Sequence, residues 1–455
     1  MKIDFVKSKI QIKNLTSNNK LYDFIIIGSG PAAVTLYKKI LTKKKNSKIL
    51  ILEEGDFFKK NYKKVSSKYL KIDLKSRAFT VGGTSSIWSN ISTYFEEFEM
   101  RSRWDKKHSY LWPLSHKSLL EEYKKLDDKY KFFFKKFKRP RINIPFEVRP
   151  FFASAKRVNF KQFINFDEID LIYNCRIGSI DERKKIATAY STDNKFKFNA
   201  KKIIICCGGI ESVSLIQNSL NQKKLNNLKN KNVSGKFFMD HPKFNLGYLK
   251  FPKYEIIDKF KFIKKNNLIF YYGISLQKNF QKKNNLLNTY VRFEEYNSKI
   301  KSYLGKLNVP LFKNIFKKKI YNVRLFCEMI PNISNSISLK KNKTLIKLKF
   351  SQIDYKTINL LAENVKYFFS KDPEKESSFN FKNSINKFED ASHHMGGLCF
   401  NPNKKLSVVD KNLRILGLNN IYVCSSAVFP SSGSANPTMT VCALGNRLGN
   451  HLVKI

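Results

Sequence analysis

Acidic residues are scarce in this sequence. Its 455 residues include 36 Asp and Glu against 86 Lys and Arg, which gives a formal net charge of +50. A charge of this size suggests a nucleic acid or an anionic membrane as partner. The lysines, however, are spread over nearly the whole length and accompany many Asn, Ile and Phe residues, the mixture that AT-rich codons impose on any protein. We therefore interpret most of the charge as solvated lysine.

Sequence features that accompany nucleic-acid binding are missing as well. The chain has no zinc-finger spacing, no aromatic RNA-binding signature and no single basic stripe. We expect no specific nucleic-acid partner. One basic segment, "FKNIFKKKIY" at 312–321, leaves open a contact with a membrane surface.

Paired cysteines and long apolar runs are the other absences. The seven cysteines form no CxxC motif, and several stand in apolar, strand-like runs, so we expect reduced, buried thiols. No stretch of about 18 apolar residues occurs, and the N-terminus lacks the apolar core and cleavage site of a signal peptide. These absences predict a soluble, cytoplasmic protein.

What the sequence does contain, close to its N-terminus, is a strand, a glycine-rich turn and a helix. The run "YDFIII" at 22–27 ends in "GSGPAA" at 28–33 and passes into a helical pattern. Gly28 permits the tight turn, Gly30 lets the backbone approach a pyrophosphate, and Ala33 allows close helix packing. The helix N-terminus would supply N–H groups to the phosphates. The turn residues Ser29, Pro31 and Ala32 complete this predicted cofactor contact.

A second strand at 47–55 closes a βαβ unit and ends near an acidic residue. Glu53 follows Gly28 by 25 positions, and we expect it to accept hydrogen bonds from ribose hydroxyls, with Glu54 as the alternative. The pattern predicts dinucleotide binding but does not distinguish FAD from NAD.

The rest of the chain alternates between two kinds of pattern. A third strand at 201–209 precedes a helical segment, and strands broken by Lys- and Asn-rich turns fill 245–350, which predicts a mostly antiparallel sheet. The last 70 residues return to turns followed by a helix. Without a repeat or long linker, the sequence predicts an α/β fold, α+β overall, in which a Rossmann-like domain interleaves with a second domain built on the antiparallel sheet.

Four motifs resemble one enzyme family. They are "GGTSSIW" at 82–88, "VSGKFFMDHP" at 233–242, "ASHHMGG" at 391–397 and "YVCSSAVFPSSGSANPTMT" at 422–440. In this order the sequence resembles the glucose-methanol-choline (GMC) oxidoreductases, FAD enzymes that oxidise alcohols and sugars. The resemblance covers nearly the whole chain and is strongest to short bacterial sugar and polyol dehydrogenase-like members and to pyranose oxidase. It implies an FAD-binding domain of residues 1–95, 150–240 and 385–455, and a substrate domain of 96–149 and 241–384.

The resemblance also implies catalytic residues. In the family a His stands three residues before the first Gly of an HxxG turn, and an Asn or second His follows in an NPT-type turn. This register makes His393 the catalytic histidine and Asn436, 43 positions later, its partner. His394 would line the pocket, or take the catalytic role if the register shifts by one. The further cofactor contacts implied are Gly82, Gly83, Thr84, Ser85, Ile177, Gly208, Ser425, Pro437 and Thr438.

The sequence also departs from the family pattern. Some relatives attach FAD covalently through a His where this chain has Ile87, so we expect non-covalent FAD. Ser425 replaces a frequent Asp and adds no charge. Gly397, Cys399 and Phe400 alter the pocket wall after the histidines, which weakens any inference about the substrate.

The chemistry of alcohol oxidation fits these residue types. An imidazole can take the hydroxyl proton, an amide can hold the substrate oxygen, and the carbon-bound hydride passes to flavin N5. We therefore predict an FAD-dependent oxidoreductase acting on the CH–OH group of an alcohol, sugar or polyol, a dehydrogenase rather than an oxidase, with an unidentified electron acceptor and no metal. The alternatives are a flavin-dependent lyase or isomerase on the same scaffold, or a basic nucleic-acid or membrane-binding protein with a vestigial flavin fold.

Overall fold

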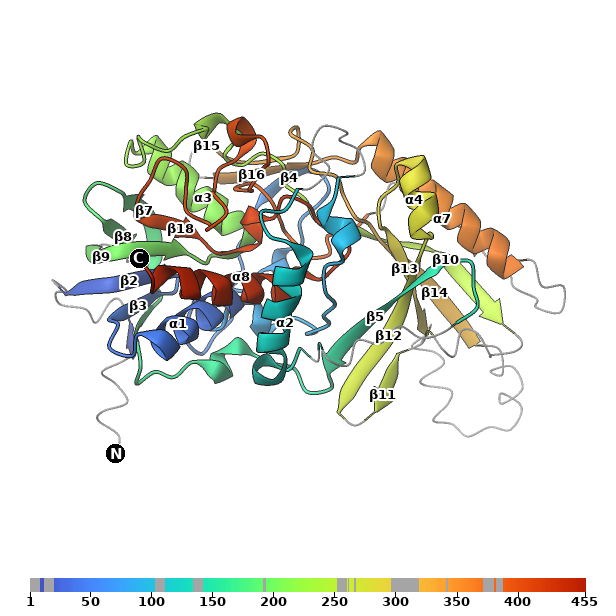
Figure 1. The fold of residues 1–455 in the computed structure, drawn as a ribbon, viewed down its shortest axis with the longest axis horizontal. Helices are drawn as coiled ribbons and strands as arrows, with labels where there is room; N and C mark the ends of the chain where they lie inside the picture. Colours follow the sequence, from blue (N-terminus) through green and yellow to red (C-terminus); the bar gives the residue numbers. More distant parts are fainter. Residues whose placement is uncertain are drawn as a thin grey trace.

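The computed structural model shows two parts, one on the left and one on the right of Figure 1. It describes residues 9–11, 20–102, 111–132, 134, 142–190, 194–251, 260, 262–265, 267–295, 319–340, 343–370, 380–381 and 388–455. The left part is built on a mostly parallel sheet and the right part on an antiparallel sheet. The basic segment at 312–321 lies outside the described residues except for its last three.

The first sheet has eight strands in the order β1-β6-β3-β2-β9-β8-β7, with β18 paired to β9. The pairs from β1 to β9 and on to β18 are parallel, and β7 and β8 extend the sheet as antiparallel strands. The central strands are continuous Ile and Leu runs because both of their faces are covered. The bounds are β1 Lys9–Gln11, β2 Leu21–Ile27, β3 Ile49–Leu52, β6 Asp170–Tyr173, β7 Arg176–Asp181, β8 Ile186–Tyr190, β9 Lys195–Ile205 and β18 Ile421–Val423.

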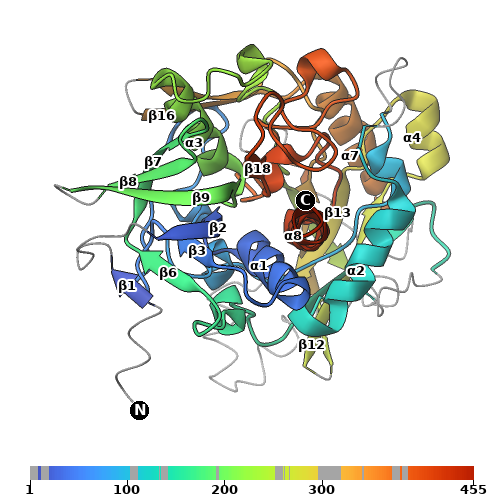
Figure 2. The same cartoon turned by 60° about the vertical axis from the view of Figure 1, so that its left-hand side comes forward.

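Helices cover this sheet on both faces. Figure 2 shows α8 end-on beside α1, with α2 packed against α8. Gly445 of α8 makes close packing possible, because a Cβ there would lie 2.5 Å from Thr35 Oγ1 and 2.9 Å from the carbonyl oxygen of Ala32. On the other face α3 lies under a small sheet of order β15-β16-β4. The bounds are α1 Pro31–Lys43, α2 His116–Tyr130, α3 Gly208–Asn221, α8 Pro437–Leu452, β4 Ser66–Tyr69, β15 Ser336–Lys340 and β16 Lys343–Leu348.

The antiparallel sheet runs in the order β11-β12-β13-β14-β10-β17, with β5 paired to β12. One face is apolar and packs under the long helix α7, through side chains such as Leu246, Val323 and Leu361. The other face carries an aromatic cluster of Phe151, Tyr271, Tyr290 and Phe326, with Ile91 of the first part packed against it. The bounds are β5 Glu147–Ser154, β10 Lys243–Phe251, β11 Ile263–Lys265, β12 Leu268–Ser275, α4 Lys278–Asn284, β13 Tyr290–Glu295, β14 Lys319–Phe326, α7 Gln352–Ser370 and β17 Asn380–Phe381.

The predicted fold class is confirmed, since parallel and antiparallel sheets coexist as expected. The strands predicted at 22–27, 47–55 and 201–209 correspond to β2, β3 and the end of β9. The strands within 336–350 were expected in the antiparallel sheet, and this expectation was wrong. They pair instead with β4, because β16 runs parallel to residues 66–69 and the hairpin packs on α3.

The domain boundary predicted between residues 149 and 150 falls inside β5, all of which pairs with β12. The expected reduced thiols are confirmed: all seven cysteines are free, six are buried and Cys207 is half-buried.

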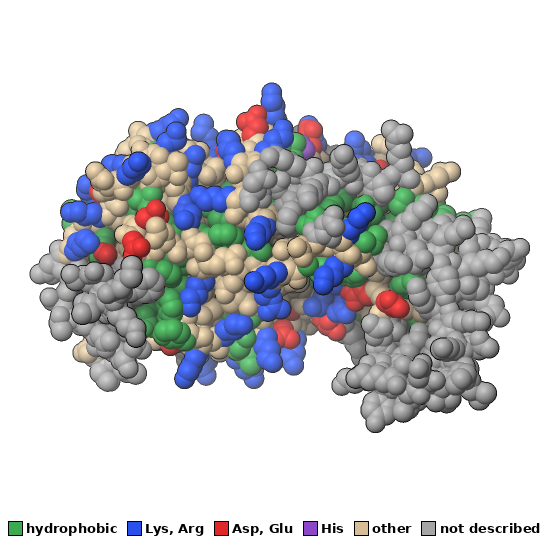
Figure 3. Space-filling model, turned by 90° about the horizontal axis from the view of Figure 1, so that it is seen from below, with side chains coloured by type: hydrophobic (Ala, Val, Ile, Leu, Met, Phe, Trp, Pro, Cys, Tyr) green, Lys and Arg blue, Asp and Glu red, His purple; other side chains and the backbone are tan. Residues whose placement is uncertain are grey.

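The placement of charged side chains on the surface agrees with the dispersed lysines of the sequence. On the face seen in Figure 3, Lys and Arg side chains are scattered among other residues instead of forming one stripe, and Asp and Glu are few. Among the described residues, no helix has the length and apolar character needed to span a bilayer.

Candidate active site

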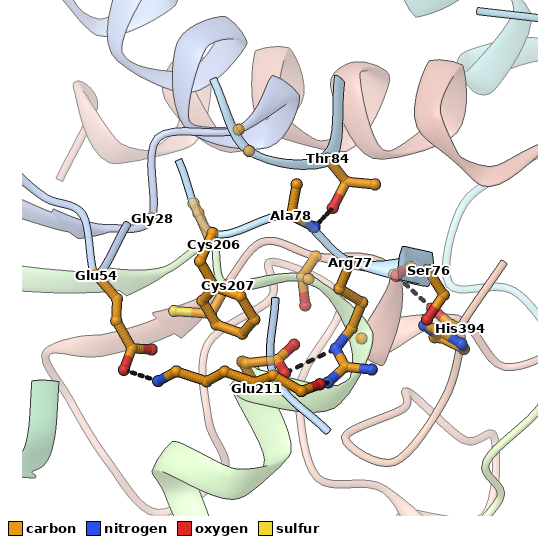
Figure 4. Close-up of a pocket in the computed structure, with 18 of the residues that line it drawn as sticks. Gly28, Glu54, Ser76, Arg77, Ala78, Thr84, Cys206, Cys207, Glu211 and His394 are labelled. Carbon is orange, nitrogen blue, oxygen red and sulfur yellow. Dashed lines mark hydrogen bonds and ion pairs between the residues drawn. The ribbon is translucent and has the colours of Figure 1, made fainter. Parts of the chain in front are cut away.

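A cavity of about 860 Å³ extends from the turn after β2 to the adjacent histidines at 393–394. Figure 4 looks into it. Across its wall Arg77 Nε lies 2.9 Å from Glu211 Oε1, and Glu54 forms an ion pair with Lys63. The volume falls in the range of pockets that hold a cofactor or a drug-sized ligand, roughly 300–1,000 Å³.

Most residues that the sequence indicated line this cavity. All three predicted catalytic residues do so: His393, His394 and Asn436. Of the predicted cofactor residues, those in the wall are Gly28, Ser29, Gly30, Pro31, Ala32, Glu53, Gly83, Thr84, Ser85, Ile177, Gly208, Ser425, Pro437 and Thr438. Ala33 is instead buried in the core, and Gly82 stands behind the wall, where a Cβ would lie 2.5 Å from Asn159 Oδ1.

The turn after β2 has the geometry of a cradle for phosphates. Gly28 has a φ of +97°, and a Cβ there would lie 2.6 Å from the carbonyl oxygen of Cys206, so only glycine fits. A Cβ at Gly30 or at Gly208 would meet no atom within 4 Å. Open space therefore lies directly beside the backbone at both positions. The free N–H groups of the first turn of α1 follow Gly30 and offer donors to an anion.

The carboxylate of Glu53 stabilises this turn by hydrogen bonds. Its Oε2 accepts hydrogen bonds from Ser29 N at 3.0 Å and Ser29 Oγ at 2.6 Å, and its Oε1 accepts one from Gly55 N at 2.8 Å. Burial raises the pKa of this carboxyl, while the three donors act in the opposite direction. Ser29 Oγ in turn accepts a hydrogen bond from Gly82 N at 3.0 Å. This bond connects the turn after β2 to the turn at Gly82 and Gly83. Glu53 is thus a structural support of the cradle as well as part of its wall.

At the other end of the cavity a chain of hydrogen bonds runs through two histidines. His241 Nε2 lies 3.1 Å from the carbonyl oxygen of Ser432, and its Nδ1 lies 3.0 Å from His393 Nδ1. The Nε2 of His393 lies 3.2 Å from Asn436 Nδ2. The two rings meet edge to face at a centroid distance of 5.1 Å.

This chain determines which nitrogen of His393 is basic. The Ser432 carbonyl only accepts, so Nε2 of His241 carries a proton. Burial lowers the pKa of His241 to about 4, so the ring is neutral near pH 7 and its Nδ1 is an acceptor. His393 must therefore donate from Nδ1, which leaves its Nε2 unprotonated beside the amide N–H of Asn436.

The pKa of His393 is also shifted. Burial lowers it well below the usual value for histidine, and His241 adds to this effect. The ordinary histidine pKa that the sequence suggested for the base is therefore replaced by a lower one. A neutral His393 is a proton acceptor over the whole physiological pH range.

Two buried aspartates hold the backbone that presents His393. Asp240 Oδ1 accepts from His393 N at 2.8 Å and its Oδ2 from Ala391 N at 2.9 Å. Asp390 Oδ1 accepts from Ser392 N at 2.6 Å and lies 3.1 Å from His394 Nε2. Burial, with the charge of Asp390 beside it, raises the pKa of Asp240 to about 7. The peptide segment 391–393 is thus fixed by Asp240 from a distant part of the chain and by the preceding residue Asp390.

His394 differs from its neighbour in every contact. Its ring stacks on Phe238, and its Nε2 is occupied by Asp390. Burial opposes its charge, but the Asp390 carboxylate outweighs burial and raises the pKa of His394. Because Nε2 of His394 is already occupied by a carboxylate while Nε2 of His393 faces the cavity residue Asn436, the geometry favours His393 for proton transfer. His394, Asp240 and Asp390 approach one another as metal ligands would, but each already has hydrogen-bond partners.

His241 and Asp240 were missed by the sequence analysis. Both belong to "VSGKFFMDHP", which the resemblance brought forward without a role for either residue. The only local signal is an adjacent acid and imidazole, and nothing in the sequence indicates that they meet residue 393.

The side chain of Asn436 carries a buried acceptor without a partner among the described residues. In the part of the chain that the structure describes, the buried Oδ1 of Asn436 makes no hydrogen bond. Asn436 lines the cavity and immediately precedes α8. An acceptor in this place fits a ligand with a hydroxyl or N–H donor.

These features define a class. A parallel βαβ sheet with a glycine cradle for a dinucleotide, together with a neutral histidine at the far end of the same cavity, is the architecture of a dinucleotide-dependent oxidoreductase.

Comparisons with known proteins narrow the class. Residues 347–445 match the family model described as GMC oxidoreductase. A crystal structure of pyridoxine 4-oxidase from Mesorbium loti superposes with a TM-score of 0.63 at 12% identity, covering 94% of this chain and 99% of that one. A formate oxidase variant from Aspergillus oryzae RIB40 gives 0.57 at 15% identity, covering 96% and 99%. No curated protein matches the chain. The C-terminal part of the chain thus matches the GMC oxidoreductases, and the chain as a whole shares the fold of these two solved structures.

The family implies FAD, and the cavity fits it. The glycine cradle and the N-terminus of α1 suit the pyrophosphate, and Asn436 and Pro437 stand at the other end for a ring system. The cavity is thus compatible with the cofactor that the family match implies.

Proposed function

We propose that the protein oxidises the CH–OH group of an alcohol, sugar or polyol, with FAD bound non-covalently. The observation that supports this most is the unprotonated Nε2 of His393 beside the Asn436 amide in the cofactor cavity. FAD, when bound, supplies the acceptor for the hydride. Each other part of the reaction falls to a residue of this chain.

In this reaction His393 receives the hydroxyl proton of the substrate at Nε2. Its Nδ1–H stays with His241, which keeps the ring in one tautomer and orientation. Asn436 Nδ2 donates to the developing alkoxide oxygen, a contribution of roughly 3 kcal/mol in comparable sites. Asp240 holds the main chain of residue 393 in place. The proton and the substrate oxygen thus meet groups whose positions are set before substrate binds.

The test is anaerobic flavin reduction followed by absorbance, with a panel of sugars and polyols. A substrate bleaches the flavin in the wild type. His393→Ala should keep the flavin bound while the reduction rate falls about 10²- to 10⁴-fold, as for a positioned general base. His394→Ala is the matched control and should lose much less. Turnover in which the flavin stays oxidised would support the lyase or isomerase alternative instead.

The electron acceptor is a separate question. We favour a dehydrogenase, in line with the sequence resemblance to dehydrogenase-like members, although both similar structures are named as oxidases. Mixing the reduced enzyme with oxygen or with a quinone decides it. Fast reoxidation by oxygen would make the protein an oxidase.

A further inference from the structure

The face of the antiparallel sheet that looks toward the cavity carries cations that the proposed reaction does not use. In the sheet register, Asn245 of β10, Arg324 of β14 and Arg292 of β13 stand directly opposite one another, so they share one face. Lys243 lies two residues before Asn245 and therefore points to the same face. Three cations thus stand on one surface.

This surface is the one turned toward the active site. Phe326, opposite Lys243 in the register, belongs to the aromatic cluster against which Ile91 packs. Ile91 is also part of the cavity wall. The opposite face of the sheet is covered by α7, so the cations stand on the face that carries the aromatic cluster.

Arginines in direct cross-strand contact destabilise a sheet unless something compensates them. Arg292 is compensated by protein groups. Its Nε lies 2.5 Å from Glu294 Oε1, its Nη1 lies 3.2 Å from the Tyr271 hydroxyl, and its guanidinium lies 4.5 Å from the centre of the Phe326 ring.

Arg324 and Lys243 are less well compensated. Both depend on Glu389, whose Oε2 lies 2.6 Å from Arg324 Nη2 and 4.0 Å from Lys243 Nζ. Two cations that are 26% and 28% exposed therefore share one carboxylate that is 64% exposed. Within the described residues, the buried Nε of Arg324 makes no hydrogen bond. One carboxylate thus faces two cations, which leaves one positive charge in excess at this place.

The cations are tied to the catalytic histidine by short stretches of chain. Lys243 follows His241 by two residues, and its N–H and C=O each bond to the backbone of Glu389 at 2.9 Å. Glu389 precedes His393 by four residues. The two cations and the base are therefore held by the same two paired segments.

On the basis of the proposed function, we propose that the substrate alcohol carries an anionic group, a carboxylate or a phosphate. Lys243 and Arg324 bind this group while the hydroxyl lies at His393. The unpartnered Nε–H of Arg324 offers a donor to either anion, while its Nη2 stays with Glu389, and Lys243 adds a point charge.

The experiment uses the flavin-loaded enzyme and three substrates with one six-carbon skeleton: sorbitol, gluconate and sorbitol 6-phosphate. The wild type should have a kcat/KM at least tenfold higher for one of the anionic members than for sorbitol. Gluconate and sorbitol 6-phosphate tell a carboxylate site from a phosphate site. Arg324→Gln and Lys243→Gln should each lower that kcat/KM about 10- to 100-fold, mainly by raising KM. The kcat/KM for sorbitol should stay the same in both variants.

Lys405→Gln is the matched control, because it removes one exposed charge outside the antiparallel sheet and should leave kcat/KM unchanged for all three substrates. A second readout needs no turnover: inorganic phosphate or acetate should perturb the spectrum of the bound flavin, and more weakly in Arg324→Gln. Equal kcat/KM for sorbitol and both anions, or no effect of Arg324→Gln on either readout, would overturn the anion site. Failure of every alcohol to reduce the flavin would contradict the proposed function, while the phosphate and acetate titrations would still decide the anion site.

Discussion

His241 decides the basicity of His393, although no motif assigns it a role. A neutral imidazole whose Nε2 is tied to a backbone carbonyl can only accept at Nδ1, and this acceptor sets the tautomer of its neighbour. At the residue scale the site is therefore a chain of three groups, Ser432, His241 and His393, in which each proton position follows from the previous one.

The pH profile tests this chain. His393 acts as a base only when neutral, so flavin reduction should fall as pH drops through its pKa. Because burial and His241 lower that pKa, the acid limb should lie below pH 6.5. In His241→Phe the limb should move to higher pH and the rate should fall at least tenfold, because the ring loses its orienting acceptor. A limb at an ordinary histidine pKa in the wild type would contradict the arrangement; in His393→Ala the limb should vanish.

Ile87 stands at the position where some relatives attach FAD covalently. It lies in the cavity wall and has no nucleophilic atom. Acid precipitation should therefore release all of the yellow flavin into the supernatant. Flavin that stays in the washed pellet would show a covalent bond formed through another residue.

At the scale of elements, the turn between β2 and α1 depends on Glu53. The sequence suggested a ribose contact, and the structure adds three hydrogen bonds that hold the turn and Gly55. Glu53→Ala should weaken FAD binding by about 1.5 to 3 kcal/mol and should also lower the Tm of the apoprotein. Titration with FAD and a thermal melt without it separate the two effects. Glu54→Ala is the comparison, since Glu54 also lines the cavity but its carboxylate pairs with Lys63 and Arg176 instead of holding the turn. A stronger effect of Glu54→Ala would move the ribose contact to that residue.

The packing of α1 on α8 is the second element-scale test. At Gly445 a Cβ would lie within 3 Å of two atoms of α1, one of them a backbone oxygen. Gly445→Ala should cost about 1 to 3 kcal/mol despite the better helix propensity of alanine, since the helices must separate. A calorimetric melt measures it, with Asn364→Ala on the exposed side of α7 as control. An unchanged Tm would mean that the helices shift without strain.

At the scale of the whole molecule, the charge of +50 has no single focus on the face seen in Figure 3. Any binding to nucleic acid should therefore be weak, indifferent to sequence and lost at moderate salt. Gel-shift titrations at increasing salt measure this. A sequence-specific complex that survives about 0.3 M salt would revive the basic binding protein as an alternative.

The sequence predicted those parts of the site in which distance along the chain sets distance in space. The turn at 28–33 lies between a strand and a helix that pack together in any βαβ unit, so its place next to Glu53 followed from spacing alone. The pairing of His393 with Asn436 came from the resemblance, and their contact at 3.2 Å agrees with it. The assignment of 336–350 to the antiparallel sheet failed because hairpins of similar composition can pair with either sheet, and the choice depends on which surface is free.

What the sequence by itself determined is the class of fold, because periodicity of apolar residues and glycine turns are local properties. Only the tertiary structure decided the chemistry of the site. His241 and Asp240 reach His393 from a separate segment of the chain, and burial in this assembly lowers the pKa of His393 while the Asp390 carboxylate raises that of His394. The two adjacent histidines have the same side chain in the sequence; burial and the charges around them, which exist only in the folded chain, lower the pKa of one and raise that of the other.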